Sequence, residues 1–185
     1  MDLNELKGNI IGVVMNYQDK DNWQDKKINQ IITTKLEDSL KMVNLNNLDT
    51  NIKYQNLSLK EQNQIKLASQ LNNETIILNN FFQTFPLKEK INFKKLLKKI
   101  SQYNKKIIIV SNNSEDFLNF VDKVYVINKE KIIFETNNLY DLGLYKYIKM
   151  PQIVEFVDLV RSKNVKIDDY FEIDELLKAV FRLKS

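Results

Sequence analysis

Short apolar runs alternate with longer amphipathic stretches along this chain. The apolar runs are rich in Ile, Val and Leu and are bounded by polar, asparagine-rich segments, which is typical of buried strands. The longer stretches repeat apolar residues at helical spacing. Strands that alternate with amphipathic helices indicate an α/β domain with a parallel sheet. The predicted strands are 10–15, 75–78, 106–110, 124–127 and 131–134, and the predicted helices are 26–43, 58–71, 87–103, 114–120, 151–162 and 172–181.

Two of the predicted helices have recognisable starts. Ser58 is followed three residues later by Glu61, the spacing of a capping box. Pro86 comes directly before the lysine-rich helix 87–103, and proline is common at such boundaries. The inward face of that second helix is predicted to carry Ile91, Leu96, Leu97 and Ile100.

The length of 185 residues suits one domain with a small appendage. The chain contains no cysteine and no histidine, which excludes disulfides, zinc sites built on those residues, and Ser-His or Cys-His catalysis. No apolar run approaches the roughly 18 residues that cross a bilayer, and the first ten residues lack the regions of a signal peptide. We therefore expect a cytoplasmic protein.

The net charge of +4 carries little functional information. Lys, Asn and Ile are abundant and have AT-rich codons, so the lysine excess is expected from base composition alone. We expect no nucleic-acid partner, and we expect the lysines of 88–106 to form a solvated helix face, with anionic lipid or nucleic acid as the alternative contact. The acidic residues of 168–175 suit the start of the last helix better than a metal site. We expect neither a metal nor a cofactor.

Five segments, taken in order, resemble an ABC-type transporter ATPase. IIGVVMNYQDKDNW is similar to the Q-loop segment, and LSLKEQNQIKLASQL to the signature segment with its helix. TIILNN stands at the place of Walker B, the apolar strand that ends in two carboxylates. KIIIVSNNSEDFLNFVDKVYVI resembles the histidine-loop strand and its successor, and KEKIIFETNNLYDL the hairpin that comes next.

The end of the chain narrows the resemblance. MPQIVEFVDLVRSKNVKIDDYFEIDELLKAV resembles the C-terminal helical extension of the ATPases of energy-coupling-factor (ECF) transporters, which import vitamins and transition metals. The resemblance implies a truncated P-loop-NTPase-like domain over 1–148, with a small helical subdomain at about 24–72. The C-terminal helical extension would cover 149–185.

The residues that carry ATPase chemistry in that family are replaced. The glycine-rich phosphate loop is missing, because Gly8, Gly12 and Gly143 do not have its spacing. Asn79 and Asn80 stand where the resemblance expects the Asp and Glu that hold Mg²⁺ and activate water. A neutral amide can serve as neither a charged ligand nor a base at pH 7. The Asn pair also suits a plain turn after a strand.

Further departures follow the same pattern. In the signature segment Ser58 is retained, but Leu59 and Lys60 replace the glycines that approach the nucleotide of the partner subunit. Asn112 stands at the switch histidine and Asn16 at the Q-loop glutamine. These positions are relics under the resemblance, and we expect neither catalysis nor nucleotide binding.

The resemblance implies a non-catalytic subunit of an ECF-type importer. Its partners would be another ABC ATPase subunit and a membrane coupling protein, which would hold the chain at the inner face of the plasma membrane. Two alternatives stay open: an ATP-binding subunit completed by another polypeptide, and a basic nucleic-acid-associated protein. In the related ATPases the phosphate-loop strand lies between the strands that resemble 106–110 and 124–127. Without it, we expect these two strands to pair directly.

Overall fold

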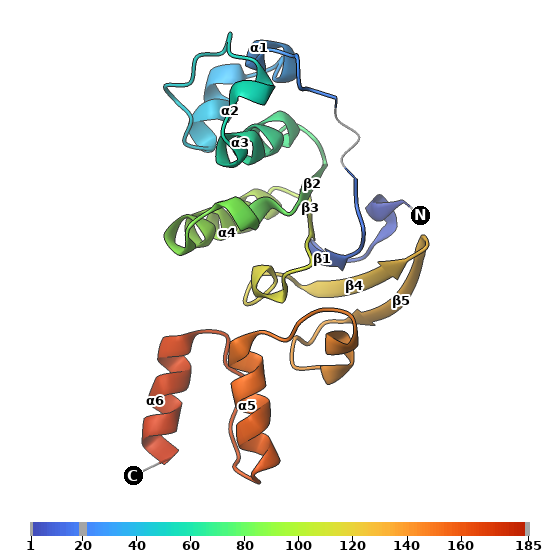
Figure 1. Ribbon diagram of the computed structural model, residues 1–185, viewed down its shortest axis with the longest axis vertical. Coiled ribbons are helices and arrows are strands. Elements are labelled where there is room, and N and C mark those ends of the chain that lie inside the picture. Colours follow the sequence, from blue (N-terminus) through green and yellow to red (C-terminus); the bar gives the residue numbers. More distant parts are fainter. Residues whose placement is uncertain (1, 19–21, 184–185) are drawn as a thin grey trace.

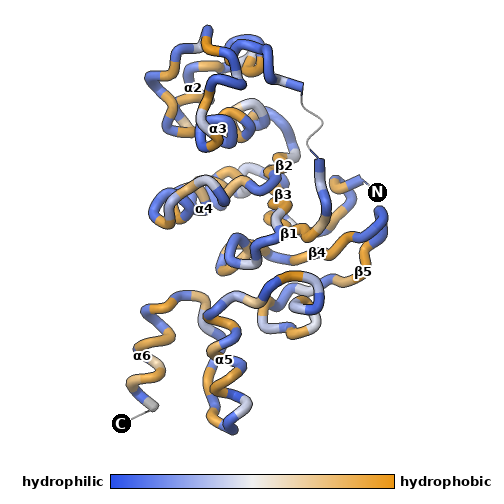
Figure 2. The backbone as a smooth tube through the Cα atoms, viewed as in Figure 1, coloured by the Kyte–Doolittle hydropathy of each residue, from blue (hydrophilic) through white to orange (hydrophobic). Residues whose placement is uncertain are grey.

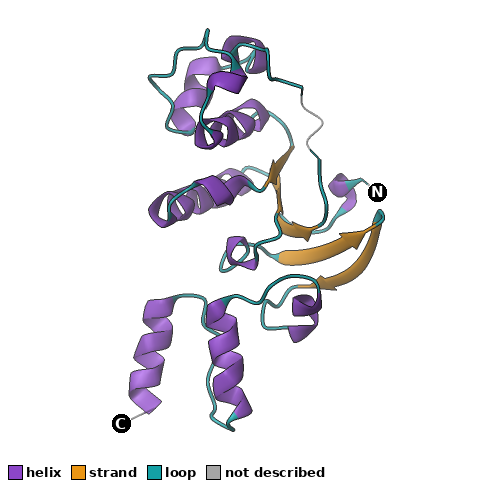
Figure 3. Ribbon diagram, viewed as in Figure 1, coloured by secondary structure: helices purple, strands orange, loops and turns teal. Residues whose placement is uncertain are grey.

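The computed structural model describes residues 2–18 and 22–183 and has a five-stranded sheet at its centre. The strand order is β2 (Thr75–Asn79), β3 (Lys106–Val110), β1 (Ile10–Val14), β4 (Lys123–Asn128) and β5 (Lys131–Thr136). Neighbouring strands from β2 to β4 are parallel, and β5 pairs with β4 in the antiparallel direction (Figures 1 and 3). The predicted α/β class and all five predicted strands are confirmed.

The predicted direct pairing of 106–110 with 124–127 is wrong, because β1 lies between these strands. Ile10 is opposite Ile107 on one side, and Gly12 is opposite Val124 on the other. All five residues of β1 are buried, as both faces of a central strand must be. The N-terminal strand therefore fills the sheet position that the resemblance gives to the phosphate-loop strand.

Two contacts hold β1 in this position. The Asp122 carboxylate accepts hydrogen bonds from the backbone N–H groups of Asn9, at 3.0 Å, and Ile10, at 2.8 Å. Further along the strand, the backbone passes close to the Phe117 ring. A Cβ atom at Gly12 would lie 2.9 Å from that ring, so only glycine fits without displacing it.

The helices α3 (Leu59–Gln70) and α4 (Leu87–Ser101) pack against one face of the sheet (Figure 1). The inward face of α4 carries Phe93, Leu97 and Ile100, all buried. Ile91 was predicted on that face, but its side chain is 45% exposed, so that prediction is wrong. Phe93 takes the inward position instead.

The opposite face of the sheet is covered by short segments. Leu3 and Leu6, in and after the 3-10 turn Leu3–Glu5, pack with Ile11, Val13 and their neighbours on β3 and β4. The Lys106 ammonium fixes this N-terminal segment by donating to the carbonyls of the same turn region. The chain thus closes this face without a long helix.

The predicted helix 26–43 is broken into α1 (Ile28–Ile31) and α2 (Leu36–Met42). Lys35 lies between them with φ 49°, a left-handed conformation that interrupts an α-helix. The predicted helix 114–120 is only a 3-10 turn over Ser114–Asp116. Apolar spacing therefore indicates where helical segments lie, but it does not predict where they break or how long they are.

The last third of the chain ends in two longer helices, α5 (Gln152–Ser162) and α6 (Ile173–Leu183), which lie side by side at the end of the molecule opposite α1 to α3 (Figure 1). The Tyr140 hydroxyl contacts the backbone of Tyr170 and ties the connecting segment to the body. In the part of the chain that the structure describes, no helix is long and apolar enough to cross a membrane. Figure 2 shows apolar residues concentrated on the central strands, and apolar and polar residues alternating along these helices.

Candidate functional site

Three neighbouring parallel strands, β2, β3 and β1, have their carboxyl ends at one edge of the sheet, where α/β proteins place their ligands. Asn79 ends β2 and Asn80 follows it. Ser111 and Asn112 follow β3, and Asn16 comes two residues after the end of β1. The positions that the sequence analysis singled out at 16, 79, 80 and 112 thus follow three neighbouring parallel strands.

The segment after β1 crosses this edge. Asn79 donates from Nδ2 to the Tyr17 carbonyl oxygen at 3.3 Å. Because β3 lies between β1 and β2 in the sheet, this contact carries the chain over the end of β3. The amide of Asn79 is therefore used to hold the protein's own backbone.

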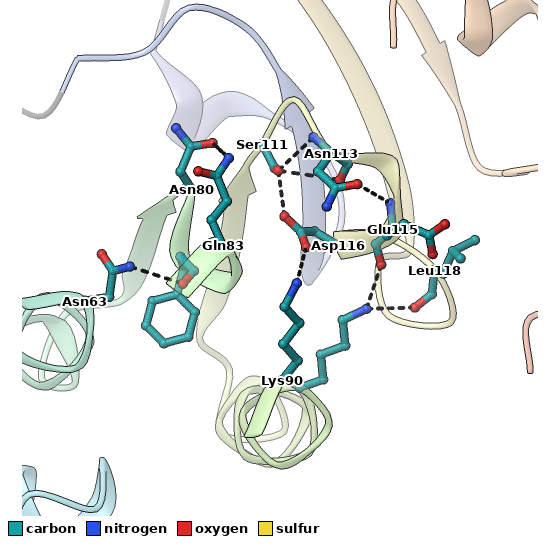
Figure 4. Close-up of polar contacts among 11 residues, drawn as sticks. Asn63, Asn80, Gln83, Lys90, Ser111, Asn113, Glu115, Asp116 and Leu118 are labelled. Carbon is teal, nitrogen blue, oxygen red and sulfur yellow. Dashed lines mark hydrogen bonds and ion pairs between the residues drawn. The ribbon is translucent and has the colours of Figure 1, made fainter. Parts of the chain in front are cut away.

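Asn80 is a turn residue. Its φ is 49°, a left-handed conformation that asparagine tolerates, and its backbone N–H donates to the Val110 carbonyl at 2.8 Å. Its side-chain oxygen accepts a hydrogen bond from Gln83 Nε2 at 3.0 Å, at the start of the next 3-10 turn (Figure 4). These contacts match the turn interpretation of the Asn pair.

A buried polar cluster follows β3, beside the exposed Asn112. The Ser111 hydroxyl donates to the Asp116 carboxylate at 2.7 Å and accepts from the Asn113 backbone N–H at 3.0 Å (Figure 4). Asp116 is 1% exposed, and burial raises the pKa of its carboxyl, while the hydrogen bond from Ser111 acts in the opposite direction. The sequence analysis missed this cluster, whose only signal was a polar pair five residues apart.

Three lysines on one side of α4 hold the segment that contains this cluster. Lys90 lies 4.0 Å from the Asp116 carboxylate. Lys94 donates to the carbonyls of Glu115 and Leu118 at 3.1 and 3.2 Å, and Lys98 donates to that of Asn119 at 2.8 Å. The three lysines are one helical turn apart, so they form a ladder. The prediction of a solvated lysine face is wrong at Lys90 and Lys94, which are partly buried, whereas Lys98 is exposed as predicted.

Lys94 is the most perturbed member of the ladder. Its ammonium lies 5.7 Å from the centre of the Phe82 ring and 5.5 Å from that of Phe120. Burial lowers the pKa of Lys94 to about 8, although Asp116 and Glu115 act to raise it. The side chain thus stabilises a turn at some cost in desolvation.

The signature-like residues lie at the start of α3, and each makes local contacts or faces solvent. Ser58 and Glu61 form the predicted capping box, and the hydrogen bonds from Ser58 lower the pKa of Glu61. Leu59 is 69% exposed. Lys60 pairs with Glu89 on α4 at 2.8 Å.

The acidic residues near the chain's end are used in helix contacts. Asp169 pairs with Arg161 at 2.7 Å, and Glu172 accepts from Asn119 Nδ2 at 3.0 Å. Asp174 and Glu175 lie in the first turn of α6, where carboxylates favour the helix dipole. This arrangement agrees with the helix-start interpretation of the acidic stretch.

Solved structures of ABC transporter cassettes are similar to this chain, and the first of them has the same fold. One is MJ1267, an ATP-binding cassette of an ABC transporter in its ADP conformation, with a TM-score of 0.51 and 13% identity over 81% of this chain and 68% of that chain. Another is the dimeric bacterial ABC transporter cassette MJ0796, with a TM-score of 0.47 and 21% identity over 54% of this chain and 44% of that chain. No protein-family model matches the chain, and a comparison with curated proteins finds no match. The chain therefore has the fold of an ABC transporter ATP-binding cassette.

Proposed function

We propose that this protein is a non-catalytic subunit with an ABC-ATPase-like fold that acts through protein contacts in an ECF-type vitamin or metal importer. One observation carries the proposal. At the edge where a nucleotide would bind, Asn79 holds the Tyr17 carbonyl of the protein's own chain. A backbone segment across this edge supports the proposal, because phosphate groups need an open crevice there.

The chemistry of the edge points in the same direction. Residues 79 and 80 carry amides, and the side-chain oxygen of Asn80 accepts a hydrogen bond from Gln83. The loss of a general base typically costs about 10²–10⁴ in rate. The segment after β1 also lacks the glycines whose N–H groups would cradle phosphates. Ser58 cannot replace the general base or the phosphate-binding glycines, because its hydroxyl is used in the capping box.

The position of β1 weighs against an ATPase completed by another polypeptide. That alternative needs a free place in the sheet for a phosphate-loop strand supplied from outside. The place between β3 and β4 is taken by β1, whose buried residues pair with both neighbours. An incoming strand would have to displace a central strand, which no local opening would allow.

The partners in this proposal are another ABC ATPase subunit and a membrane coupling protein. The segment after β1 and the nearby helices would contact the coupling protein, and the extension at 149–185 would contact the second ATPase-like chain. These contacts would hold the protein at the inner face of the plasma membrane. The proposal rests on the resemblance in the tail and on the cassette fold.

A nucleotide titration tests the proposal. We expect purified protein to show no saturable binding of Mg²⁺-ATP by calorimetry and no release of phosphate. A pull-down at native expression should recover ECF importer components. ATP turnover that disappears in an Asn79→Ala, Asn80→Ala double variant would overturn the proposal, because that activity would belong to this chain. Recovery of the protein alone would contradict the assignment to an importer.

A further inference from the structure

A buried amide on α3 has an oxygen without a hydrogen-bond donor. Gln64 is 3% exposed, and its Nε2 donates to the Val43 carbonyl oxygen at 2.6 Å. This contact fixes the orientation of the amide, because a flipped amide would place two oxygens together. The Oε1 atom of Gln64 then has no partner among the described residues. A buried acceptor without a donor destabilises a fold, so a donor from outside the chain would stabilise this one.

Gln64 lines a cavity of about 490 Å³, a size that suits a small molecule. The cavity lies between the start of α3, the segment after α2 and the first two turns of α4. Phe93, which is buried, and Leu45, which is half-buried, form its apolar part. Its polar lining residues, besides Gln64, are Asn44, Ser58, Lys60, Glu61, Glu89 and Asn92.

The charged groups of this cavity favour a cation. Lys60 is the one basic residue among the described lining residues, and its ammonium already pairs with Glu89 Oε1 at 2.8 Å. Glu61 is ionised at neutral pH, because the hydrogen bonds from Ser58 lower its pKa. One carboxylate is therefore in excess, in the same cavity as an amide oxygen that lacks a donor.

Other occupants fit less well. A phosphate group or a free carboxylate would meet two carboxylates, at 61 and 89, and would bring no N–H group to the Gln64 oxygen. A water molecule can donate to that oxygen, but one water occupies only about 30 Å³ and makes no apolar contact with Phe93 or Leu45. The lining thus favours an occupant that has a positive charge, an N–H donor and a short hydrocarbon part.

We propose that this cavity binds a small organic ammonium ion. Its N–H group donates to Gln64 Oε1, and the Glu61 carboxylate balances its charge. Its hydrocarbon part packs against Phe93 and Leu45. The inference goes beyond the proposed function and does not depend on it, because neither a nucleotide nor an importer component takes part in the contact.

A titration with two cations, followed by NMR, tests the proposal on the wild-type protein. The first probe is n-butylammonium, and the reporters are the side-chain NH₂ group of Gln64 and the backbone N–H group of Leu45. We expect both signals to shift in a saturable way, with a dissociation constant in the millimolar range or below. Tetramethylammonium has the same charge but no N–H group, so it should bind at least tenfold more weakly.

A pair of variants tests the role of the amide. Gln64→Leu should weaken the binding of n-butylammonium at least tenfold, as measured at the Leu45 signal. Gln62→Leu is the matched control and should leave binding unchanged. Gln62 is on the same helix and its amide also donates to backbone carbonyls, but it does not line the cavity. The comparison of the two cations uses the wild type alone, so it remains decisive if a variant does not fold.

Three results would overturn the proposal. The first is the absence of a saturable shift with n-butylammonium at high millimolar concentration. The second is equal binding of the two cations, or equal weakening by Gln64→Leu and Gln62→Leu, because the amide oxygen would then not select the ligand. The third is saturable binding of inorganic phosphate at the same signals, which would show that the cavity selects an anion.

Discussion

The buried Lys94 ammonium predicts a defined change of stability with pH. Its pKa is about 8 in the folded chain and 10.5 for the free side chain. Well below pH 8 both states are protonated, so the contribution of this group to stability is unfavourable but does not change with pH. Between pH 8 and 10.5 the folded state releases the proton first, and the unfolded state binds more protons, so stability rises with pH. The sign follows from the cost of burying the charged amine.

The magnitude follows from the size of the shift. A shift of about 2.5 pKa units corresponds to about 3 kcal/mol at 1.36 kcal/mol per unit. The rings of Phe82 and Phe120 favour the charged form, and Lys94 is partly open to solvent, so we expect a gain of about 1–3 kcal/mol. The neutral amine can still donate its hydrogen bonds to the turn carbonyls.

Urea unfolding at intervals from pH 7 to 10.5 measures the effect. Tyrosines and other lysines titrate in the same range, so the useful quantity is the stability of the wild type minus that of Lys94→Met. This difference should rise with pH, while the difference from the exposed control Lys95→Met should stay flat. A flat difference for Lys94→Met would refute the argument, because it would mean that the ammonium is fully hydrated in the folded state.

Two further predictions concern the ends of the sheet. Asp122→Ala should lower the free energy of unfolding by about 1–3 kcal/mol in urea, because it removes both hydrogen bonds that fix the start of β1; an unchanged midpoint would contradict this role. Gln70→Leu should cost about 1–2 kcal/mol and promote self-association in sedimentation, because the Gln70 amide pairs with both backbone groups of Ile77 on the open edge of β2. A stable, monomeric Gln70→Leu variant would show that the Gln70 amide is not needed to protect the open edge of β2.

Local features of the fold were predictable because local chemistry determines them. In the strand at 106–110, the residues 107–110 are β-branched and buried, and Ser58 with Glu61 caps a helix through side-chain hydrogen bonds. The break at Lys35 was not predictable, because the apolar repeat of 26–43 continues across it. Tertiary packing of α1 and α2 decides where that helix stops.

Features that depend on contacts between distant residues were not predicted correctly from the sequence. The spacing of Lys90, Lys94 and Lys98 is visible in the sequence, but their partners lie 21 to 26 residues further along the chain; they are backbone carbonyls for Lys94 and Lys98 and the Asp116 carboxylate for Lys90. The position of β1 in the sheet was also not predictable, because an apolar run does not indicate which strands pair with it. Asp122 stands directly before a predicted strand, but nothing in the sequence indicates that its carboxylate binds the start of the N-terminal strand.

The position of β1 completes the centre of the sheet. A parallel sheet cannot leave its central place empty, because both faces and both edges of a central strand are buried. Here Ile10–Val14 fills that place, and Leu3 and Leu6 cover part of the face beside it. The segment that leaves β1 then crosses the carboxyl edge and is held by Asn79. The same strand that completes the core thus directs the following segment across the carboxyl edge of the sheet, so the packing of the core and the course of that segment have one structural cause.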